Sequence, residues 1–229
     1  MITLYDSPMA PSPRRARILL AEKGVTHQTV LVDLRRGEQM GTAYRQINPL
    51  CTVPALRIEE GEAGEAGEEG AEGREGKEGG QMLIDNAAIA AYLEARFPEP
   101  PLLGITPLEK AEVASWNWRV EFEGLMAIAE ALRNSSPAMQ DRALPGPIDY
   151  AQIPELAQRG LQRLAQFFET LNTRLEGRDT LATDRFSIAD ITAMVTVDFA
   201  KAVRLQPGDA HPHLQRWRAA MALRPSMAL

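Results

Sequence analysis

The sequence has 229 residues, of which 45% are apolar, and a formal net charge of −6 at pH 7. This length suits one large domain or two small ones, and the apolar content suffices for a hydrophobic core. Cys51 is the single cysteine, which excludes an intramolecular disulfide, and the N-terminal segment MITLYDSPMAPSPRR lacks an apolar run long enough for a signal or membrane segment. We therefore expect a soluble, cytoplasmic protein with no membrane partner.

The negative charge is concentrated in one Gly/Glu-rich segment, residues 59–80. Nine glutamates against Arg74 and Lys77 give it a net charge of −7, which by subtraction leaves +1 for the rest of the chain. Such a segment buries too little apolar surface to offset its ordering entropy, so we predict a disordered insert. The alternative is an acidic arm for a basic partner. No basic patch with interleaved aromatic residues is present elsewhere, so we expect no nucleic-acid partner.

The first hundred residues alternate predicted strands and helices. Residues 2–5 (ITLY) form a strand, and SPRRARILLAEKG then predicts a helix with Ser12 as N-cap, Pro13 at the first helical position and Gly24 as the stop. Residues 29–34 (TVLVDL) alternate as a second strand.

A predicted hairpin follows. Residues 55–58 (ALRI) and 82–84 (MLI) are its two arms on either side of the acidic insert, and DNAAIAAYLEARFP predicts a helix that ends at Pro98. The predicted order is βαβ followed by ββα.

Pro54 stands where the third strand begins, although a proline cannot donate a hydrogen bond to a sheet. This placement, in TVPAL, together with the order βαβ-ββα, resembles the α/β thioredoxin-like N-terminal domain of the glutathione transferases. The resemblance implies that the Val53–Pro54 bond is cis and that the backbone of Val53 pairs with the cysteinyl part of glutathione. A cis bond before proline is accessible at only about 0.5–1 kcal/mol. A trans proline at an edge strand is the alternative.

The segment DNAAIAAYLEARFP resembles the helix whose N-terminus holds the γ-glutamyl carboxylate in that family. Unpaired N–H groups at a helix start attract a carboxylate. The resemblance implies that Asp85 pairs with the ammonium group of glutathione and that Asn86, where the family usually has Ser, donates through its amide. The alternative is that one of them only caps the helix. Gln39 is a further candidate, for the glycyl carboxylate.

The second half resembles the all-helical C-terminal domain of the same family. FSIADITA contains Ser187 and Asp190 at the spacing of a capping box, and long amphipathic helices are predicted in residues 107–134 and 154–177. The predicted division is a glutathione-binding domain (1–97), a linker (98–106) and an all-helical domain (107–229).

If the resemblance holds, the chemistry is attack of the glutathione thiolate on an electrophile. A thiol with a pKa near 8.5 is mostly protonated at neutral pH, so the protein must stabilise the thiolate. Family members use a Tyr, Ser or Cys near the first helix, but here that position falls on Pro11 or Ala10. Ser12 and Tyr5 are the nearby catalytic candidates. Their alternatives are a helix N-cap and a core aromatic residue, respectively.

The first-helix segment most resembles an atypical transferase branch in which an ordered water donates to the sulfur. Polar side chains on the first long helix of the second domain hold that water, and the corresponding stretch here is LRNSSP. The resemblance implies roles for Arg133, Asn134 and Ser135. The alternative is an ordinary helix C-terminus, with Arg133 complementing the helix dipole and Asn134 as C-cap.

We therefore predict a glutathione transferase that acts on small apolar electrophiles, with glutathione as co-substrate and a homodimer implied by the resemblance. The alternatives are a non-catalytic or regulatory protein of the same fold and a glutathione-dependent isomerase or reductase. Cys51 lies outside the first-helix motif of the thiol-reducing members. His211 and His213 form no evident cluster with His27, so we expect no metal.

Three aromatic residues on the first long helix leave two possibilities open. Trp116, Trp118 and Phe122 either line the electrophile pocket or pack within the helical domain or at a dimer interface.

Overall fold

The structure is a computed structural model that describes residues 1–59 and 80–229. The predicted disorder of the Gly/Glu-rich insert therefore falls outside the described residues. Four strands and three α-helices make up the first part: β1 (Ile2–Asp6), α1 (Pro11–Glu22), β2 (Gln28–Leu31), α2 (Thr42–Ile47), β3 (Ala55–Ile58), β4 (Gln81–Leu83) and α3 (Asn86–Arg96). The second part is helical: α4 (Pro107–Arg119), the π-helical η2 (Val120–Leu125), α5 (Met126–Ser135), α6 (Pro154–Arg174), α7 (Ile188–Phe199) and α8 (Pro212–Met221). Short 3₁₀ turns complete the described chain: η1 (Glu38–Met40), η3 (Pro137–Met139), η4 (Ala200–Val203) and η5 (Pro225–Ala228).

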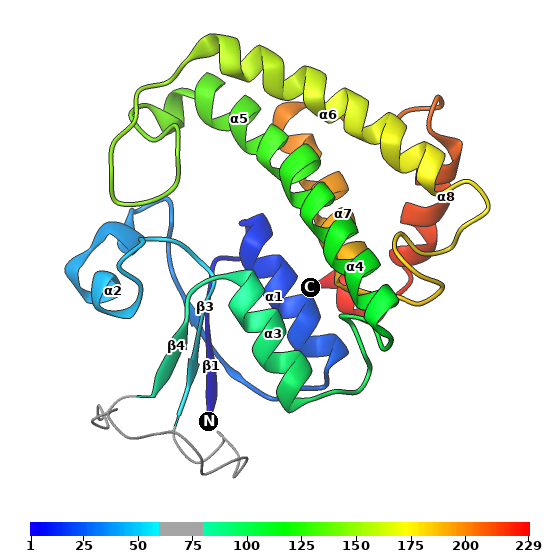
Figure 1. Cartoon of the computed structure of the whole chain (residues 1–229). Helices are drawn as coiled ribbons and strands as arrows, with labels where there is room; N and C mark the ends of the chain where they lie inside the picture. Colours follow the sequence, from blue (N-terminus) through cyan, green and yellow to red (C-terminus); the bar gives the residue numbers. More distant parts are fainter. Residues whose placement is uncertain (60–79) are drawn as a thin grey trace.

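The four strands form one mixed sheet in the order β2-β1-β3-β4. β1 runs parallel to β2 and antiparallel to β3, and Leu56 of β3 pairs with both Leu4 of β1 and Leu83 of β4. The predicted βαβ-ββα order is confirmed. Figure 1 shows α1 and α3 beside this sheet and the helical part beyond them.

The two faces of the sheet are covered by different elements. Side chains alternate along a strand, so Ile2 and Leu4 belong to the main core with α1 and α3, whereas Tyr5 points to the other face. There it forms a small second cluster with Tyr44 of α2 and Val32. The alternation of β1 thus separates Tyr5 from the face on which α1 packs.

The second predicted strand is shorter than expected. β2 ends at Leu31, and all four of its residues are exposed because it is an edge strand that pairs only with β1. Val32, just beyond the strand, is the residue that enters the core.

The predicted start of the first helix is wrong by two residues. α1 begins at Pro11, and its N-cap is Ala10, whose side chain makes no capping hydrogen bond. Ser12 therefore lies inside the first turn and is not the N-cap. Proline at the first helical position has a preset φ and needs no N–H partner there, which favours this start. The predicted stop is confirmed, because Gly24 has φ +63° and its N–H bonds the Ala21 carbonyl at 3.0 Å.

The helix predicted over residues 107–134 is confirmed as a continuous run of α4, η2 and α5 (Figure 1). At its centre, a Cβ atom on Gly124 would lie 2.5 Å from Cε1 of Phe167 in α6, so only glycine allows this close approach. None of the helices in the described ranges is long and apolar enough to cross a membrane.

The predicted capping box at the start of α7 is confirmed. Asp190 is fully buried and accepts hydrogen bonds from the N–H of Leu181 (2.7 Å), the N–H of Ser187 (3.0 Å) and the Ser187 hydroxyl (3.1 Å). Burial raises the pKa of the Asp190 carboxyl, although these donors oppose the shift. The side chain fixes the start of α7 to the loop before it.

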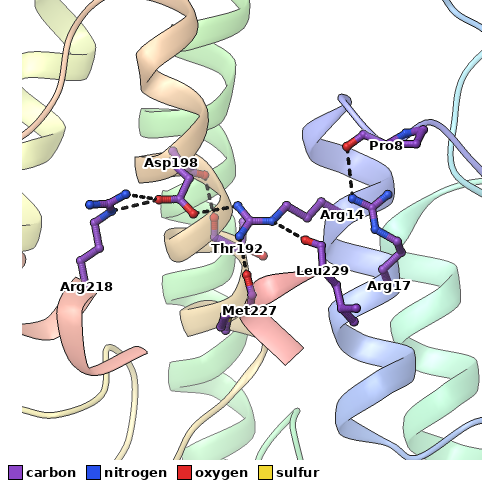
Figure 2. A network of polar contacts seen from close by, with 9 residues as sticks. Pro8, Arg14, Arg17, Thr192, Asp198, Arg218, Met227 and Leu229 are labelled. Carbon is purple, nitrogen blue, oxygen red and sulfur yellow. Dashed lines mark hydrogen bonds and ion pairs between the residues drawn. The ribbon is translucent and has the colours of Figure 1, made fainter. Parts of the chain in front are cut away.

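Arg14 of α1 joins the sheet-containing part to the helical part. Its guanidinium donates to Asp198 of α7 at 2.8 Å and to the carbonyl groups of Met227 (2.8 Å) and Leu229 (3.0 Å). Figure 2 shows Asp198 held from its other side by Arg218 of α8. One side chain of α1 is thus bonded to three points of the helical part.

A buried lysine fixes the connecting segment, residues 98–106, which contains no helix or strand. The ammonium group of Lys23 is buried and donates to Glu94 of α3 and to the Pro100 carbonyl, both at 2.6 Å. Glu94 also accepts the N–H of Leu102 at 3.2 Å. Because its ammonium group is paired with a carboxylate and a carbonyl oxygen, Lys23 can be buried at the C-terminal end of α1.

Glu22 provides a test of this packing. It accepts hydrogen bonds from the Arg224 guanidinium (2.7 Å) and from the Ser226 hydroxyl. Burial raises the pKa of Glu22, but the hydrogen bonds from Arg224 and Ser226 and the charge of Arg224 together lower it by more. The pKa therefore lies below its ordinary value of 4.5. A carboxyl whose pKa falls on folding stabilises the folded state above its unfolded pKa, and this stabilisation is lost as the pH falls through the folded pKa.

We therefore predict that Glu22→Gln lowers the free energy of unfolding near pH 7 by about 1–2 kcal/mol. The difference from the unaltered protein shrinks below about pH 4.5. Urea unfolding at a series of pH values measures it, with the exposed Glu176→Gln as control. A difference that does not depend on pH would contradict the role of the carboxylate charge.

Candidate functional site

The N-termini of α1 and α3 meet at the candidate site. Of the two candidate caps of α3, Asp85 is the N-cap and accepts the N–H of Ala88 at 2.8 Å. Asn86, the first residue of α3, donates its amide to the Ser12 carbonyl at 3.2 Å. The two helix starts that the family resemblance assigns to glutathione are therefore in direct contact.

The first turn of α1 offers few donors. Pro11 and Pro13 have no N–H, and the N–H of Arg14 bonds the Ala10 carbonyl at 3.4 Å, so Ser12 keeps the one free backbone donor of this turn. Within the described ranges the half-buried Ser12 side chain has no hydrogen-bond partner. Its N–H and hydroxyl are both available to a ligand.

The Val53–Pro54 bond is cis, as predicted. Val53 is half-buried, and neither its N–H nor its carbonyl finds a partner among the residues that the structure describes. A backbone with a free donor and acceptor at this place can pair with an extended ligand as a strand does.

Asn48 and Tyr44 fix the loop that leads to Pro54. Asn48 is fully buried; its amide donates to the Thr52 carbonyl at 2.8 Å and accepts the N–H of Leu50 at 2.9 Å. The Tyr44 hydroxyl donates to the same Thr52 carbonyl at 2.7 Å. Burial raises the pKa of Tyr44 well above its ordinary value, so the hydroxyl keeps its proton and remains a donor. The sequence analysis did not single out Asn48, although the Asn-Pro pair marks a turn.

Tyr5 lies in the second core cluster. It is buried, and its ring packs edge-to-face against Tyr44 with a centroid distance of 6.1 Å. This is the arrangement expected of a core aromatic residue.

Gln39 lies in η1 and is also buried. Its amide oxygen has no hydrogen-bond partner in the described part of the chain, an arrangement that a bound polar group would relieve. The position suits the predicted contact with glutathione.

Asn134 and Ser135 lie at the end of α5. The prediction that Asn134 is the C-cap is wrong, because the helix continues to Ser135 and its C-cap is Ser136. The Asn134 amide donates to the Glu130 carbonyl and accepts the N–H of Ile153, both at 2.9 Å, and the Ser135 hydroxyl donates to its own helix. The nitrogen and the oxygen of the Asn134 side-chain amide therefore both make hydrogen bonds within the protein.

The last turn of α5 is completed by a residue from the following loop. The Gln152 amide donates to the carbonyl groups of Arg133 (2.7 Å) and Ser136 (2.8 Å), which satisfies the helix end. Arg133 itself donates to the Arg142 carbonyl at 2.8 Å.

The remaining candidates are a buried thiol and an exposed aromatic pair. Cys51 is 4% exposed, with φ +55°, and its Sγ is 3.6 Å from the Pro49 carbonyl oxygen. Trp118 and Phe122 stack on each other at 5.1 Å on the exposed side of the long helix. Within the described ranges no group of His, Cys, Asp and Glu side chains could hold a metal ion.

Comparison with known proteins identifies the family. The family model described as "Glutathione S-transferase, N-terminal domain" matches residues 10–96, and the model described as "Glutathione S-transferase, C-terminal domain" matches residues 134–225. Glutathione S-transferase 2 of Saccharomyces cerevisiae is 30% identical over 98% of this chain and 87% of its own length. The crystal structure of a glutathione S-transferase domain-containing protein from Marinobacter aquaeolei VT8 superposes with a TM-score of 0.82 at 32% identity, covering 98% of this chain and 99% of that one.

A third relative has a different activity in its name. Maleylacetoacetate isomerase of Pseudomonas aeruginosa is 38% identical over 47% of this chain and 43% of its own. A thioredoxin-like domain in which the starts of α1 and α3 are in contact, followed by a helical domain, agrees with both family descriptions. The chain belongs to the glutathione S-transferase family of enzymes.

We predict that Asn48→Ala lowers the free energy of unfolding by about 1–3 kcal/mol, because Thr52 and Leu50 each lose a buried partner. The loss also weakens glutathione binding, since the loop no longer holds Val53 in place. Urea unfolding and calorimetric titration with glutathione measure the two effects. The exposed Gln28→Ala in β2 is the control, and an unchanged stability of Asn48→Ala would refute the role.

Proposed function

We propose that this enzyme binds glutathione across the N-termini of α1 and α3 and activates its thiol for attack on small apolar electrophiles. The observation that carries the proposal is the hydrogen bond from Asn86 to the Ser12 carbonyl, since it brings two helix starts together. Each start favours a negative charge, and glutathione presents a carboxylate and a thiolate.

The binding roles follow from the free groups of the site. The Val53 backbone pairs with the cysteinyl part of glutathione, and Pro54 sets the turn that presents it. Asp85 is exposed and binds the ammonium group, while Asn86 and the α3 N-terminus bind the γ-glutamyl carboxylate. Gln39 contacts the glycyl end, where its unpaired amide oxygen accepts the glycyl N–H and its amide NH₂ faces the carboxylate.

Ser12 is the proposed thiolate donor. Its N–H and hydroxyl are the donors that the first turn of α1 leaves free. The Tyr5 ring is packed against Tyr44, and Asn134 and Ser135 make hydrogen bonds within the protein. We therefore rank Tyr5, Asn134 and Ser135 below Ser12 as candidate thiolate donors.

Two alternatives differ in how they use glutathione. An isomerase is the second candidate because of the likeness of the first half to the Pseudomonas enzyme. Conjugation consumes one glutathione for each product, whereas isomerisation returns it, so the amount of thiol lost distinguishes them. A reductase that uses Cys51 is disfavoured by the burial of that side chain.

The thiol is tested directly by the ultraviolet absorbance of the glutathione thiolate, titrated on the protein across pH. Saturable binding with the thiol pKa lowered by about two units supports activation; each unit corresponds to about 1.4 kcal/mol. Binding with an unshifted thiol would instead support a non-catalytic glutathione-binding protein. An activated aryl halide compared with a mixed-disulfide substrate then separates conjugation from reduction.

We predict that Ser12→Ala raises the pKa of the bound thiol by about one unit, because the hydroxyl donor is lost while the backbone N–H remains. With a thiol pKa near 8.5 lowered by about two units, this rise reduces the thiolate fraction at pH 7 from about three-quarters to about one-quarter, so conjugation falls about threefold. Tyr5→Phe serves as the matched loss of a hydroxyl and leaves the pKa unchanged. If the pKa of the bound thiol rises in Tyr5→Phe and not in Ser12→Ala, Tyr5 is the thiolate donor.

We propose a cytoplasmic homodimer, with Trp118 and Phe122 in its interface. Their stacked rings are more than half exposed, and the Arg163 guanidinium lies 5.0 Å from the Phe122 centroid. A rigid exposed aromatic pair is typical of a contact surface.

Phe122→Glu is therefore expected to convert the dimer into a monomer. Light scattering after size-exclusion chromatography would report 25.2 kDa in place of twice that mass. Leu223→Glu, a change at an equally apolar and exposed position elsewhere, leaves the mass of the assembly unchanged. If Phe122→Glu remains a dimer, the interface lies on another face.

A further inference from the structure

Two arginines, Arg133 in the last turn of α5 and Arg142 in the loop that follows, lack a carboxylate partner within the described ranges. Arg133 donates to the Arg142 carbonyl at 2.8 Å, and among the described residues neither guanidinium forms an ion pair. The acidic residues of the same loop, Asp141 and Asp149, pair with neither of them. Glu130, one turn earlier, is bonded to two arginines of α6.

This arrangement is electrostatically unfavourable. Burial lowers the pKa of the half-buried Arg133, and the like charge of Arg142 lowers it further. Buried charges in proteins are normally paired, and guanidinium groups bind carboxylates through two parallel N–H donors. A bound anion would relieve the repulsion between the two groups.

The loop that carries Arg142 has a fixed shape. The N–H of Ala143 donates to the Tyr150 carbonyl (3.1 Å), and the N–H of Tyr150 donates to the Asp141 carbonyl (2.9 Å). Asn134 holds the far end of the loop through the N–H of Ile153. Because the loop is already ordered, it loses little conformational entropy when a ligand binds.

The tip of the loop reaches the part of the chain that holds the proposed glutathione site. Gly146 has φ +123°, and a Cβ atom there would lie 3.8 Å from the carbonyl oxygen of Leu50, three residues before Val53. In Figure 1 the loop between α5 and α6 extends from the helical part toward the segment around α2. A molecule held by this loop is therefore near the glutathione site.

The loop also exposes apolar side chains. Leu144, Ile148 and Tyr150 are each more than two-fifths exposed. Exposed apolar groups beside two unpaired cations match a ligand with an apolar body and one anionic group.

We propose that the electrophile of this enzyme carries a carboxylate, which binds to Arg142 and Arg133, while Leu144, Ile148 and Tyr150 contact its apolar body. The inference rests on the proposed function and changes its substrate class from small apolar electrophiles to electrophiles with an apolar body and one carboxylate. Arg142 is then a specificity-determining residue, and Arg133 both binds the anion and holds the loop.

Two matched electrophiles test the proposal: 4-(chloromethyl)benzoate and its methyl ester. In both, the glutathione thiolate attacks the benzylic carbon; the C–S bond forms as the C–Cl bond breaks, and chloride leaves with the electron pair. The thiol proton has already passed to the solvent. The two probes differ in the anionic group and not in the reaction.

In the unaltered enzyme, kcat/KM corrected for the uncatalysed rate is expected to be higher for the benzoate than for the ester. Arg142→Gln lowers the value for the benzoate about tenfold or more, because a charge-assisted bond is lost, and changes the ester less than about twofold. Arg142→Lys restores part of the preference. The KM for glutathione does not change.

Arg178→Gln is the matched control. Arg178 is exposed, also adds its charge to a neighbouring arginine, Arg174, and lies beyond the other end of α6. Helix α6 has 21 residues and is therefore about 30 Å long, so this site is remote from the loop. The control should leave both electrophiles unaffected.

Five results would overturn the proposal. Equal losses for benzoate and ester would show that Arg142 only supports the loop, and no loss would show that it contacts nothing. If Arg142→Gln raises the KM for glutathione with both probes, Arg142 binds a carboxylate of glutathione and not one of the electrophile. An unactivated thiol in the unaltered protein refutes the proposed function as well, whereas an activated thiol with no benzoate preference refutes the carboxylate alone.

Discussion

The packing of α1 between the sheet and the helical part is the constraint on which the rest of the structure depends. The helix contacts both α3 and α7, and its apolar side chains are buried in the main core. Its charged residues are bonded at both ends: Arg14 to α7 and the C-terminal segment, and Lys23 to α3 and the connecting segment. The N-terminus of α1 is therefore held in one place, which is what a site built on a helix start requires.

The same rule of charge satisfaction separates structural residues from functional ones. Asp190 and Glu94 are acidic groups surrounded by donors, and their role is to fix loops and helix starts. Arg133 and Arg142 are the contrasting case, because the described chain offers Arg133 a carbonyl and offers neither side chain a carboxylate. Val53 and Ser12 have free backbone groups in the same sense. Groups left unpaired by the fold mark the places where a ligand can complete it.

Local signals predicted most of the elements. The stop at Gly24 and the capping box at Ser187 depend on short-range backbone chemistry, and both are confirmed. The cap at Ser12 was predicted wrongly because Pro11 is an equally good first helical residue, and sequence alone does not choose between neighbouring prolines. The short β2 was mispredicted because strand alternation does not reveal which strand is at the edge.

The sequence by itself determined the order of elements and the family resemblance, because these depend on spacing and residue types; the cis bond at Pro54 follows only from that resemblance. Only the tertiary structure decided that Asn86 meets Ser12, that Tyr5 enters a core cluster, and that Arg133 lies beside Arg142. Each of these contacts joins residues from different elements or from a loop whose path is not local. The physical reason is that the packing of whole elements sets such distances, and no pattern within a single element encodes them.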